Sequence, residues 1–386
     1  MKKKILRIVL PFFLILLLGF FLLGPRVTET LMNRVLQSPP YAASEKARRL
    51  HSKLLVVDLH ADSLLWDRDL LARGSRAHLD IPRLIEGGVA LQAFTVVTKV
   101  PFGLNIERNS DRSDQIFLLR IAQLRPLSGW SSLTARALDQ AQRLSDFSRR
   151  SEGRFVLIRS ATDLMSYIAR RRSEPGITAG FLGIEGAHAL DGKLENLPVL
   201  YAAGFRMIGL THFFDNDFAG SAHGTVKYGL TAKGRELIRR MEASHILVDL
   251  AHSSPQTVAD VLAIATRPVV VSHSGVKGTC DNTRNLSDEQ LRGIARTGGV
   301  IGIGYWDTAV CGKDAAAIAR AMRHAVDVAG IDHVGLGSDF DGAISAPFDT
   351  TGLVQITDAL LAAGFTEEEI AKLMGGNSLR LLAASL

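Results

Sequence analysis

The sequence contains few cysteines and few prolines, and both shortages limit what the protein can be. Only 2 of its 386 residues are Cys and 12 are Pro, whereas 35 are Gly and 47% are hydrophobic. Such a composition excludes a disordered or collagen-like chain and provides enough apolar residues for a large globular core. The frequent glycines suit an α/β protein with many tight turns between strands and helices.

The sequence also lacks a general surplus of basic residues. Its formal net charge is +6, but five of the 45 basic residues precede the first acidic residue, Glu29, which leaves 40 basic against 39 acidic residues. A protein that binds nucleic acid needs a basic excess on one face. We therefore expect no nucleic-acid partner.

The early basic residues flank an apolar segment. Lys2–Arg7 is positively charged, and Ile8–Leu23 is an uninterrupted apolar run, slightly short of the ~20 residues of a spanning helix unless its neighbours extend it. The run lacks a cleavage motif of small residues and a lipid-attachment cysteine, so residues 1–26 favour an uncleaved membrane anchor over a cleaved signal peptide. The positive flank predicts that the rest of the chain lies outside the cytoplasm, on the periplasmic or extracytoplasmic side of an inner membrane.

The remainder divides into a short connection and one long domain. Residues 27–52 are interpreted as a polar, amphipathic tether, and residues 53–386 as a single large domain. Within this domain, nearly continuous apolar runs alternate with amphipathic helical stretches, as expected for parallel strands buried on both faces. The predicted strands are Leu54–Asp58, Val89–Val97, Thr178–Ile184, Phe205–Thr211, Ile246–Leu250, Pro268–Ser272, Gly299–Gly304 and His333–Ser338.

Eight strand-helix units in one domain predict a (β/α)8 TIM barrel. The stretch between Val97 and Thr178 is too long for one connection, and its helix-like segments and the short apolar run Phe155–Ile158 indicate an insertion after the second strand. The alternative fold is a doubly wound open sheet. That fold would be supported by a glycine-rich phosphate loop after the first strand, and none follows Asp58.

Residues that can bind metal follow six of the predicted strands. They are His60 and Asp62 after the first strand, Glu185 after the third, His212 after the fourth, His252 after the fifth, His273 after the sixth and Asp339 after the eighth. A lone histidine is more often structural than functional. Four histidines and three carboxylates at corresponding strand ends, which meet on one rim of a barrel, instead predict a metal site.

The ligand types suggest which ions would bind. Histidine and carboxylate without thiolate suit Zn²⁺, and also Mn²⁺, Co²⁺ or Fe²⁺. His60 and Asp62 share one face because they are two residues apart on a strand. They could hold one ion with Glu185, while His252, His273 and the second oxygen of Glu185 hold another. A bridging carboxylate places two cations about 3.5–4 Å apart, where they can share one hydroxide.

Together these motifs resemble the membrane (renal-type) dipeptidase family of peptidases. The resemblance runs in order from about Leu54 to Ser378. It is carried by His60-x-Asp62, Gly183-Ile184-Glu185-Gly186, Leu210-Thr211-His212, Asp249-Leu250-Ala251-His252, Ser272-His273-Ser274, Arg284-Asn285 and Gly337-Ser338-Asp339-Phe340-Asp341-Gly342. It implies a TIM barrel, two zinc ions bridged by a glutamate, and hydrolysis of dipeptides as substrates. Several members also open β-lactam rings and accept a D-residue in the second position.

The resemblance also implies a role for each residue. His60, Asp62, Glu185, His252 and His273 match the family's metal ligands. His212 matches the histidine that polarises the scissile carbonyl, and Arg284 and Asp339 match the substrate-binding and proton-shuttling positions. The loop Phe213–His223 departs from the mammalian type, so the substrate preference stays open.

Other residues have less certain roles. Tyr305 and Trp306 follow the seventh strand, and we expect Tyr305 to bind substrate, although packing is an equal alternative. His188 could lie beside the site, but a hydrogen bond within its loop is the stronger alternative, and His223 could either enter the pocket or cap a turn. Cys280 and Cys311 follow neighbouring strands, and paired cysteines occur at the corresponding places in the family, so we expect a disulfide between them. We keep a homodimer as a hypothesis.

Two alternatives to a dipeptidase remain. A metallohydrolase of the wider amidohydrolase type would normally begin with His-x-His and use a modified lysine as the bridge, where this sequence has Asp62 and Glu185. A catalytically inactive barrel that binds partners in the cell envelope would have lost ligands, and all the expected ligands are present.

Overall fold

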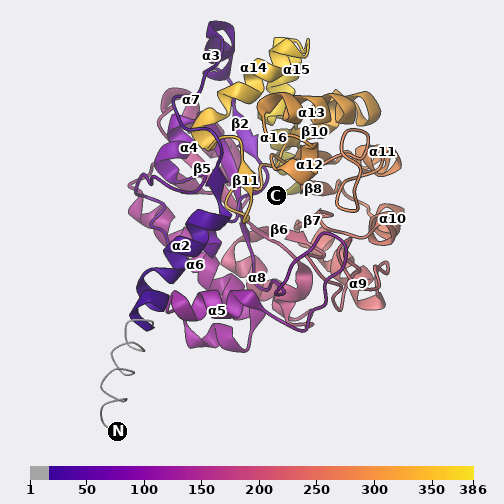
Figure 1. Ribbon diagram of the computed structural model, residues 1–386. Coiled ribbons are helices and arrows are strands. Elements are labelled where there is room, and N and C mark those ends of the chain that lie inside the picture. The colour runs from indigo at the N-terminus through magenta and orange to yellow at the C-terminus, as the bar shows by residue number, and fades with distance from the viewer. Residues whose placement is uncertain (1–16) are drawn as a thin grey trace.

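Figure 1 shows the computed structural model, which describes residues 17–386. All of the positively charged flank Lys2–Arg7 and more than half of the apolar run Ile8–Leu23, predicted as an anchor, lie outside these residues. Among residues 17–386, none of the helices combines the length and apolarity needed to cross a bilayer.

Eight parallel strands form a closed barrel, which confirms the predicted (β/α)8 architecture. Their order is β2-β3-β5-β6-β7-β8-β9-β10, and β10 closes the ring by pairing with β2. Every residue of these strands is buried, as the continuous apolar runs predicted. The strands are β2 (Val56–Asp58), β3 (Val89–Val96), β5 (Thr178–Ile184), β6 (Phe205–Gly209), β7 (Leu247–Asp249), β8 (Val270–Ser274), β9 (Val300–Ile303) and β10 (Val334–Leu336).

Helices surround the barrel, and most begin at a Ser, Thr or Asp whose side chain accepts a backbone N–H of the first turn. Each capping residue fixes where a loop ends and where its helix begins. The loops at the carboxyl ends of the strands are therefore held in defined positions. The helices are α4 (Ile81–Glu86), α8 (Asn196–Ala203), α9 (Ala232–Ala243), α10 (Pro255–Ile264), α11 (Asp288–Arg296), α12 (Asp307–Val310), α13 (Ala315–Ala329), α14 (Val354–Ala362), α15 (Glu367–Ala371) and α16 (Asn377–Ser385).

The predicted insertion lies between β3 and β5. It contains α5 (Gln115–Ala122), α6 (Leu133–Arg150) and α7 (Ala161–Ser173), with a short strand, β4 (Phe155–Leu157), between the last two. Because β4 pairs with the first half of β5 and β6 pairs with its second half, β4 extends the sheet at the amino end of the barrel without entering the ring. The strand β4 therefore lies away from the carboxyl rim, whereas α5 reaches it, with Ile116 and Leu119 in the wall of the cavity there.

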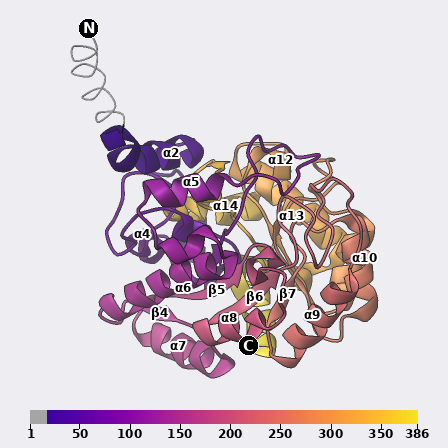
Figure 2. The same cartoon turned by 90° about the horizontal axis from the view of Figure 1, so that it is seen from below.

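The segment interpreted as a tether is packed against the barrel. It includes α2 (Gly24–Met32) and β1 (Arg34–Val35), and β1 pairs with β11 (Ser345–Ala346). Further along, α3 (Glu45–His51) packs against α14. Figure 2 shows α2 lying beside α5 at one edge of the molecule. Residues 27–52 are thus a folded part of the structure rather than a free spacer.

Candidate active site

Glu185 lies at the centre of the histidines and carboxylates on the carboxyl rim. Its Oε1 is 3.5 Å from Nε2 of His60, 3.0 Å from Nε2 of His252 and 3.4 Å from Nε2 of His273. Its Oε2 is 3.2 Å from Nε2 of His212. Residues that come from five different strands therefore meet at one carboxylate.

Two more carboxylates complete the cluster. Nε2 of His60 lies 3.5 Å from Oδ1 of Asp62 and 4.0 Å from Oδ1 of Asp339. The ligand atoms form three overlapping groups, and within each group they lie no more than 4.8 Å from one another. The groups are His60 with Glu185 and His273, Glu185 with His212 and His252, and His60 with Asp62 and Asp339. The structure thus brings together all seven residues named from the sequence. His212 lies as close to Glu185, at 3.2 Å, as the predicted ligands lie to each other, and Asp339 lies slightly farther away, at 4.0 Å from His60.

The donor set fits divalent cations. Burial, followed by the charge of Asp62, raises the pKa of Glu185 well above its usual value, and burial raises the pKa of Asp339 to about 8. Positive charge placed among these carboxylates would offset both effects. Nε2 of His60 is fully buried and has no hydrogen-bond partner among residues 17–386, so its lone pair is available to a cation.

One serine orients two of the histidines. The hydroxyl of Ser272 donates to Oδ2 of Asp249 at 2.6 Å and lies 3.0 Å from Nδ1 of both His60 and His273. Because its single proton is given to Asp249, the hydroxyl can only accept from the two Nδ1–H groups. That tautomer leaves both Nε2 lone pairs directed at Glu185. Asp249 and Ser272 stand in motifs that the sequence shows plainly, but this orienting role follows only from the contacts between the strands.

Asp58 joins the first and last strands of the barrel beneath the site. Its carboxylate accepts from the backbone N–H of His60 at 3.0 Å and of Ser338 at 3.1 Å. The hydroxyl of Tyr305 also donates to it, at 3.4 Å. Tyr305 is 1% exposed and is not among the residues that line the cavity, whereas the neighbouring Trp306 is, so a contact between Tyr305 and substrate stays a prediction.

Two of the site residues have an unusual backbone conformation. His252 has a φ of 61° and Asp339 a φ of 60°, in the left-handed region that few residues other than glycine adopt. Such conformations persist only where surrounding contacts enforce them, and they concentrate at functional sites. Both side chains are turned toward the cluster as a result.

Among residues 17–386, Arg284 is the one arginine in the wall of the cavity. Its Nη2 donates to the backbone oxygen of His273 at 2.8 Å, and its Nη1 donates to the hydroxyl of Ser274 at 3.2 Å. Burial lowers the pKa of its guanidinium to about 10, which leaves it charged at neutral pH. No carboxylate lies within ion-pair distance of it in the described part of the chain, so the guanidinium can still receive an anionic group.

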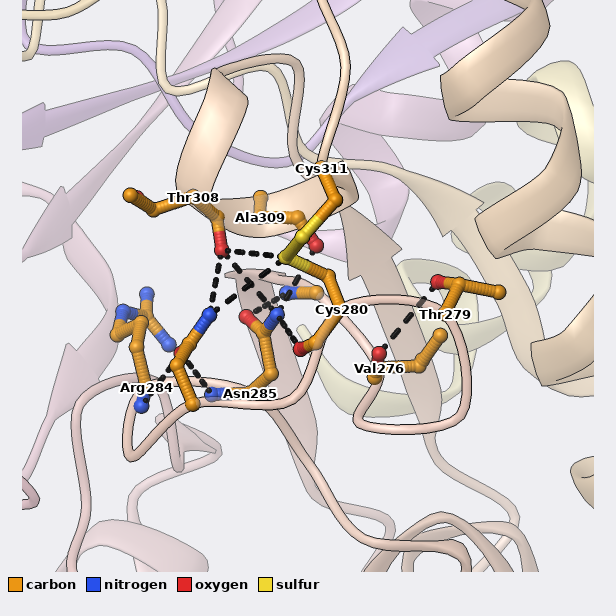
Figure 3. Close-up of a disulfide and its surroundings, with 10 residues drawn as sticks. Val276, Thr279, Cys280, Arg284, Asn285, Thr308, Ala309 and Cys311 are labelled. Atoms are coloured by element: carbon orange, nitrogen blue, oxygen red, sulfur yellow. Dashed lines mark hydrogen bonds between the residues drawn. A yellow bond between two sulfur atoms is a disulfide. The ribbon is translucent and has the colours of Figure 1, made fainter.

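The loop that carries Arg284 is held by covalent and hydrogen bonds. Cys280 and Cys311 form a disulfide, which confirms the predicted pairing (Figure 3). Beside the disulfide, Nδ2 of Asn285 donates to the backbone oxygens of Cys280 at 2.6 Å and Ala309 at 3.0 Å. The loops after β8 and β9 are therefore tied together next to Arg284.

The cluster forms one end of a cavity of about 380 Å³. His223 lines it, with Nδ1 2.6 Å from the backbone oxygen of Ile106, while His188 is buried against Phe214. The remaining wall is mostly apolar. Its apolar side chains are Met32, Leu65, Trp66, Val97, Val100, Leu104, Ile106, Ile116, Leu119, Phe213, Trp306 and Ile344.

The chain resembles characterised peptidases over most of its length. It is 29% identical to dipeptidase tcpJ of Claviceps purpurea over 340 residues, which cover 85% of this chain and 74% of that protein. A solved dipeptidase of metallopeptidase family M19 superposes with a TM-score of 0.71 at 29% identity, over 86% of this chain and 98% of that one.

A second solved structure carries a ligand. It is a metallopeptidase from Rhodobacter sphaeroides bound to a phosphinate mimic of the dipeptide L-Ala-D-Ala, and it superposes with a TM-score of 0.69 at 27% identity, over 86% of this chain and 99% of that one. The family model for membrane dipeptidases, peptidase family M19, matches residues 44–385. With its barrel and its rim of metal-binding side chains, the chain belongs to the membrane dipeptidase family of metallopeptidases.

Proposed function

We propose that this metallo-dipeptidase cleaves free dipeptides, L-D dipeptides included, with two zinc ions that share Glu185. The observation that carries the proposal is the position of Glu185, whose Oε1 lies within 3.5 Å of Nε2 of His60, His252 and His273, the histidines proposed for the two ions. His60 and Asp62 would hold one ion, and His252 and His273 the other. The L-D specificity is supported by the likeness to the Rhodobacter sphaeroides enzyme that binds an L-Ala-D-Ala mimic.

Zinc bound there would polarise the peptide carbonyl and activate a water molecule. His212 is kept neutral, because burial lowers its pKa well below the usual value, so its N–H can donate to the oxygen that becomes negative during the reaction. Asp339 lines the same cavity and can accept a proton and return it to the leaving amine. Arg284 offers a planar pair of donors to the terminal carboxylate.

A direct test combines metal content with turnover. The purified protein should contain two zinc ions per chain and hydrolyse members of a panel of L-L and L-D dipeptides. Glu185→Gln should lower the metal content and abolish turnover, because it removes the shared ligand. An active wild type whose metal content and rate survive this substitution would contradict the bridging role. A protein with no activity on any dipeptide would favour an inactive barrel or a hydrolase of another substrate.

We also propose that residues 1–26 anchor the protein in the inner membrane, with the barrel on the periplasmic side. The basic flank and apolar run support this, and so do the exposed side chains of Leu18, Leu22 and Leu23, which are 57%, 70% and 59% accessible. The disulfide between Cys280 and Cys311 suits an oxidising compartment.

A further inference from the structure

The N-terminal helix α2 takes part in the catalytic cavity although it lies outside the part of the chain that the family shares. The family match begins at residue 44, and α2 ends at Met32. Thr28 and Met32 of this helix nevertheless line the same cavity as Glu185 and Asp339. Part of the cavity wall therefore lies outside the residues that match the family model.

The residues of α2 fall into three stripes that follow the helical repeat. Val27 and Leu31 face solvent and are 51% and 68% exposed. Glu29 is 2% exposed and is buried against the barrel. Thr28 and Met32, four residues apart, form the third stripe and face the mouth of the cavity, where Met32 keeps 38% of its surface exposed.

Buried ion pairs hold α2 to the loop that carries Asp339. Arg68 forms ion pairs with both Glu29 and Asp341, and Arg76 contacts Glu29 at 2.7 Å. On the same loop, the backbone N–H of Ala343 donates to the side chain of Asn33 at 2.8 Å. The helix therefore keeps a defined position relative to the catalytic loop.

The charged groups of the site define which end of a dipeptide lies next to α2. Arg284, which suits the terminal carboxylate, follows β8. The carboxylate that suits the terminal ammonium group, Asp339, follows β10, which pairs with β2. Because α2 is attached to the loop after β10 and packs against α5, it lies on the ammonium side.

The wall on that side is apolar. Met32 faces the cavity together with Leu65 and Trp66, which come shortly after Asp62, and with Ile116 and Leu119 of α5. We infer that α2 completes a subsite for the side chain of the first residue of the dipeptide, and that this subsite selects large apolar side chains. This inference rests on the proposed dipeptidase function.

The test compares two neighbouring residues of one helix. Met32→Ala removes the side chain that faces the cavity, and Leu31→Ala, the matched control, removes one that faces solvent. The wild type should favour Leu-Ala over Gly-Ala by at least about tenfold in kcat/KM. Met32→Ala should lower kcat/KM for Leu-Ala about five- to twentyfold with little change for Gly-Ala or Ala-Leu, and Leu31→Ala should change none of the three.

A charged side chain at position 32 distinguishes an effect on substrate selectivity from an effect on protein stability. Met32→Glu should raise the ratio of Lys-Ala to Leu-Ala hydrolysis by more than tenfold, which a loss of stability could not produce. Equal losses on all substrates in the Met32 variants, or a wild type that accepts every first residue alike, would overturn the subsite while leaving dipeptidase activity intact. A wild type that cleaves no dipeptide would overturn the proposed function as well.

Discussion

At the scale of single residues, the site depends on side chains that would not touch the substrate. The Ser272 hydroxyl accepts from the Nδ1–H groups of His60 and His273 while donating to Asp249. A ligand histidine with its proton fixed on Nδ1 presents Nε2 to the metal at no cost in reorientation. The affinity for zinc should therefore depend on Ser272 as well as on the ligands.

Ser272→Ala should weaken zinc binding about 10- to 100-fold, because both rings lose the acceptor that sets their tautomer. Competition with a chelator measures the affinity directly. Ser253→Ala is the control, because the Ser253 hydroxyl is buried next to His252 and has no hydrogen-bond partner among residues 17–386. Equal zinc affinity in the wild type and Ser272→Ala would show that the serine does not orient the ligands.

Arg284 and Asp339 should affect different kinetic constants. Asp339→Asn should keep both metal ions and lower kcat about 10²- to 10⁴-fold, since it removes a proton carrier. Arg284→Ala should mainly raise KM for a free dipeptide and matter far less for a dipeptide amide, which has no terminal carboxylate. Both variants are tested by steady-state kinetics with a free dipeptide and with a dipeptide amide, together with a measurement of bound zinc. Loss of zinc from Asp339→Asn would make Asp339 a ligand instead.

At the scale of elements, Asp341 connects three segments of the chain. It pairs with Arg68, accepts from the backbone N–H of His78 at 2.7 Å and accepts from the hydroxyl of Ser63 at 2.6 Å. Burial alone would raise its pKa, but the Arg68 guanidinium and the hydrogen bonds from His78 and Ser63 hold the pKa far below the usual value. Through Arg68 the same network reaches Glu29 of α2.

This depressed pKa makes stability depend on pH in a defined direction. The contribution of the Asp341 carboxylate is fully present above its unfolded pKa of about 4 and is lost as the pH falls toward its folded pKa. Asp341→Asn should lower the unfolding free energy at pH 7 by about 3–5 kcal/mol, since Arg68 loses a buried partner. Denaturant titrations between pH 7 and pH 3 should show that the difference in unfolding free energy between wild type and variant becomes smaller as the pH falls. A difference in unfolding free energy that does not change with pH would contradict this role of Asp341.

At the scale of the whole molecule, α2 connects the N-terminal segment to the barrel. The described helical residues from Leu17 onward lead directly into α2, which lies against α5 at the edge of the barrel (Figure 2). The catalytic cavity is therefore bordered by the first folded element after the apolar segment. A membrane held by that segment would lie on the same side of the molecule as α2.

Deletion of residues 1–23 should release the enzyme from the membrane fraction while kcat/KM for dipeptides stays within about twofold, because α2 and the cavity are retained. The full chain should stay with the membrane through a high-salt wash, since apolar insertion is not screened by ions. Fractionation followed by activity assays measures both. A soluble mature protein that begins after Gly24 would show that the segment is a cleaved signal peptide.

The sequence by itself determined the barrel and the set of site residues. Strands buried on both faces require unbroken apolar runs, and parallel strands end on one rim. His60, Glu185 and Asp339 each follow such a strand, so they could be placed together without coordinates. Only the tertiary structure decided the contact of Tyr305 with Asp58, the sharing of the Ser272 hydroxyl and the packing of α2 on the cavity. These features depend on contacts between residues far apart in the chain, and no local pattern in a sequence records such contacts.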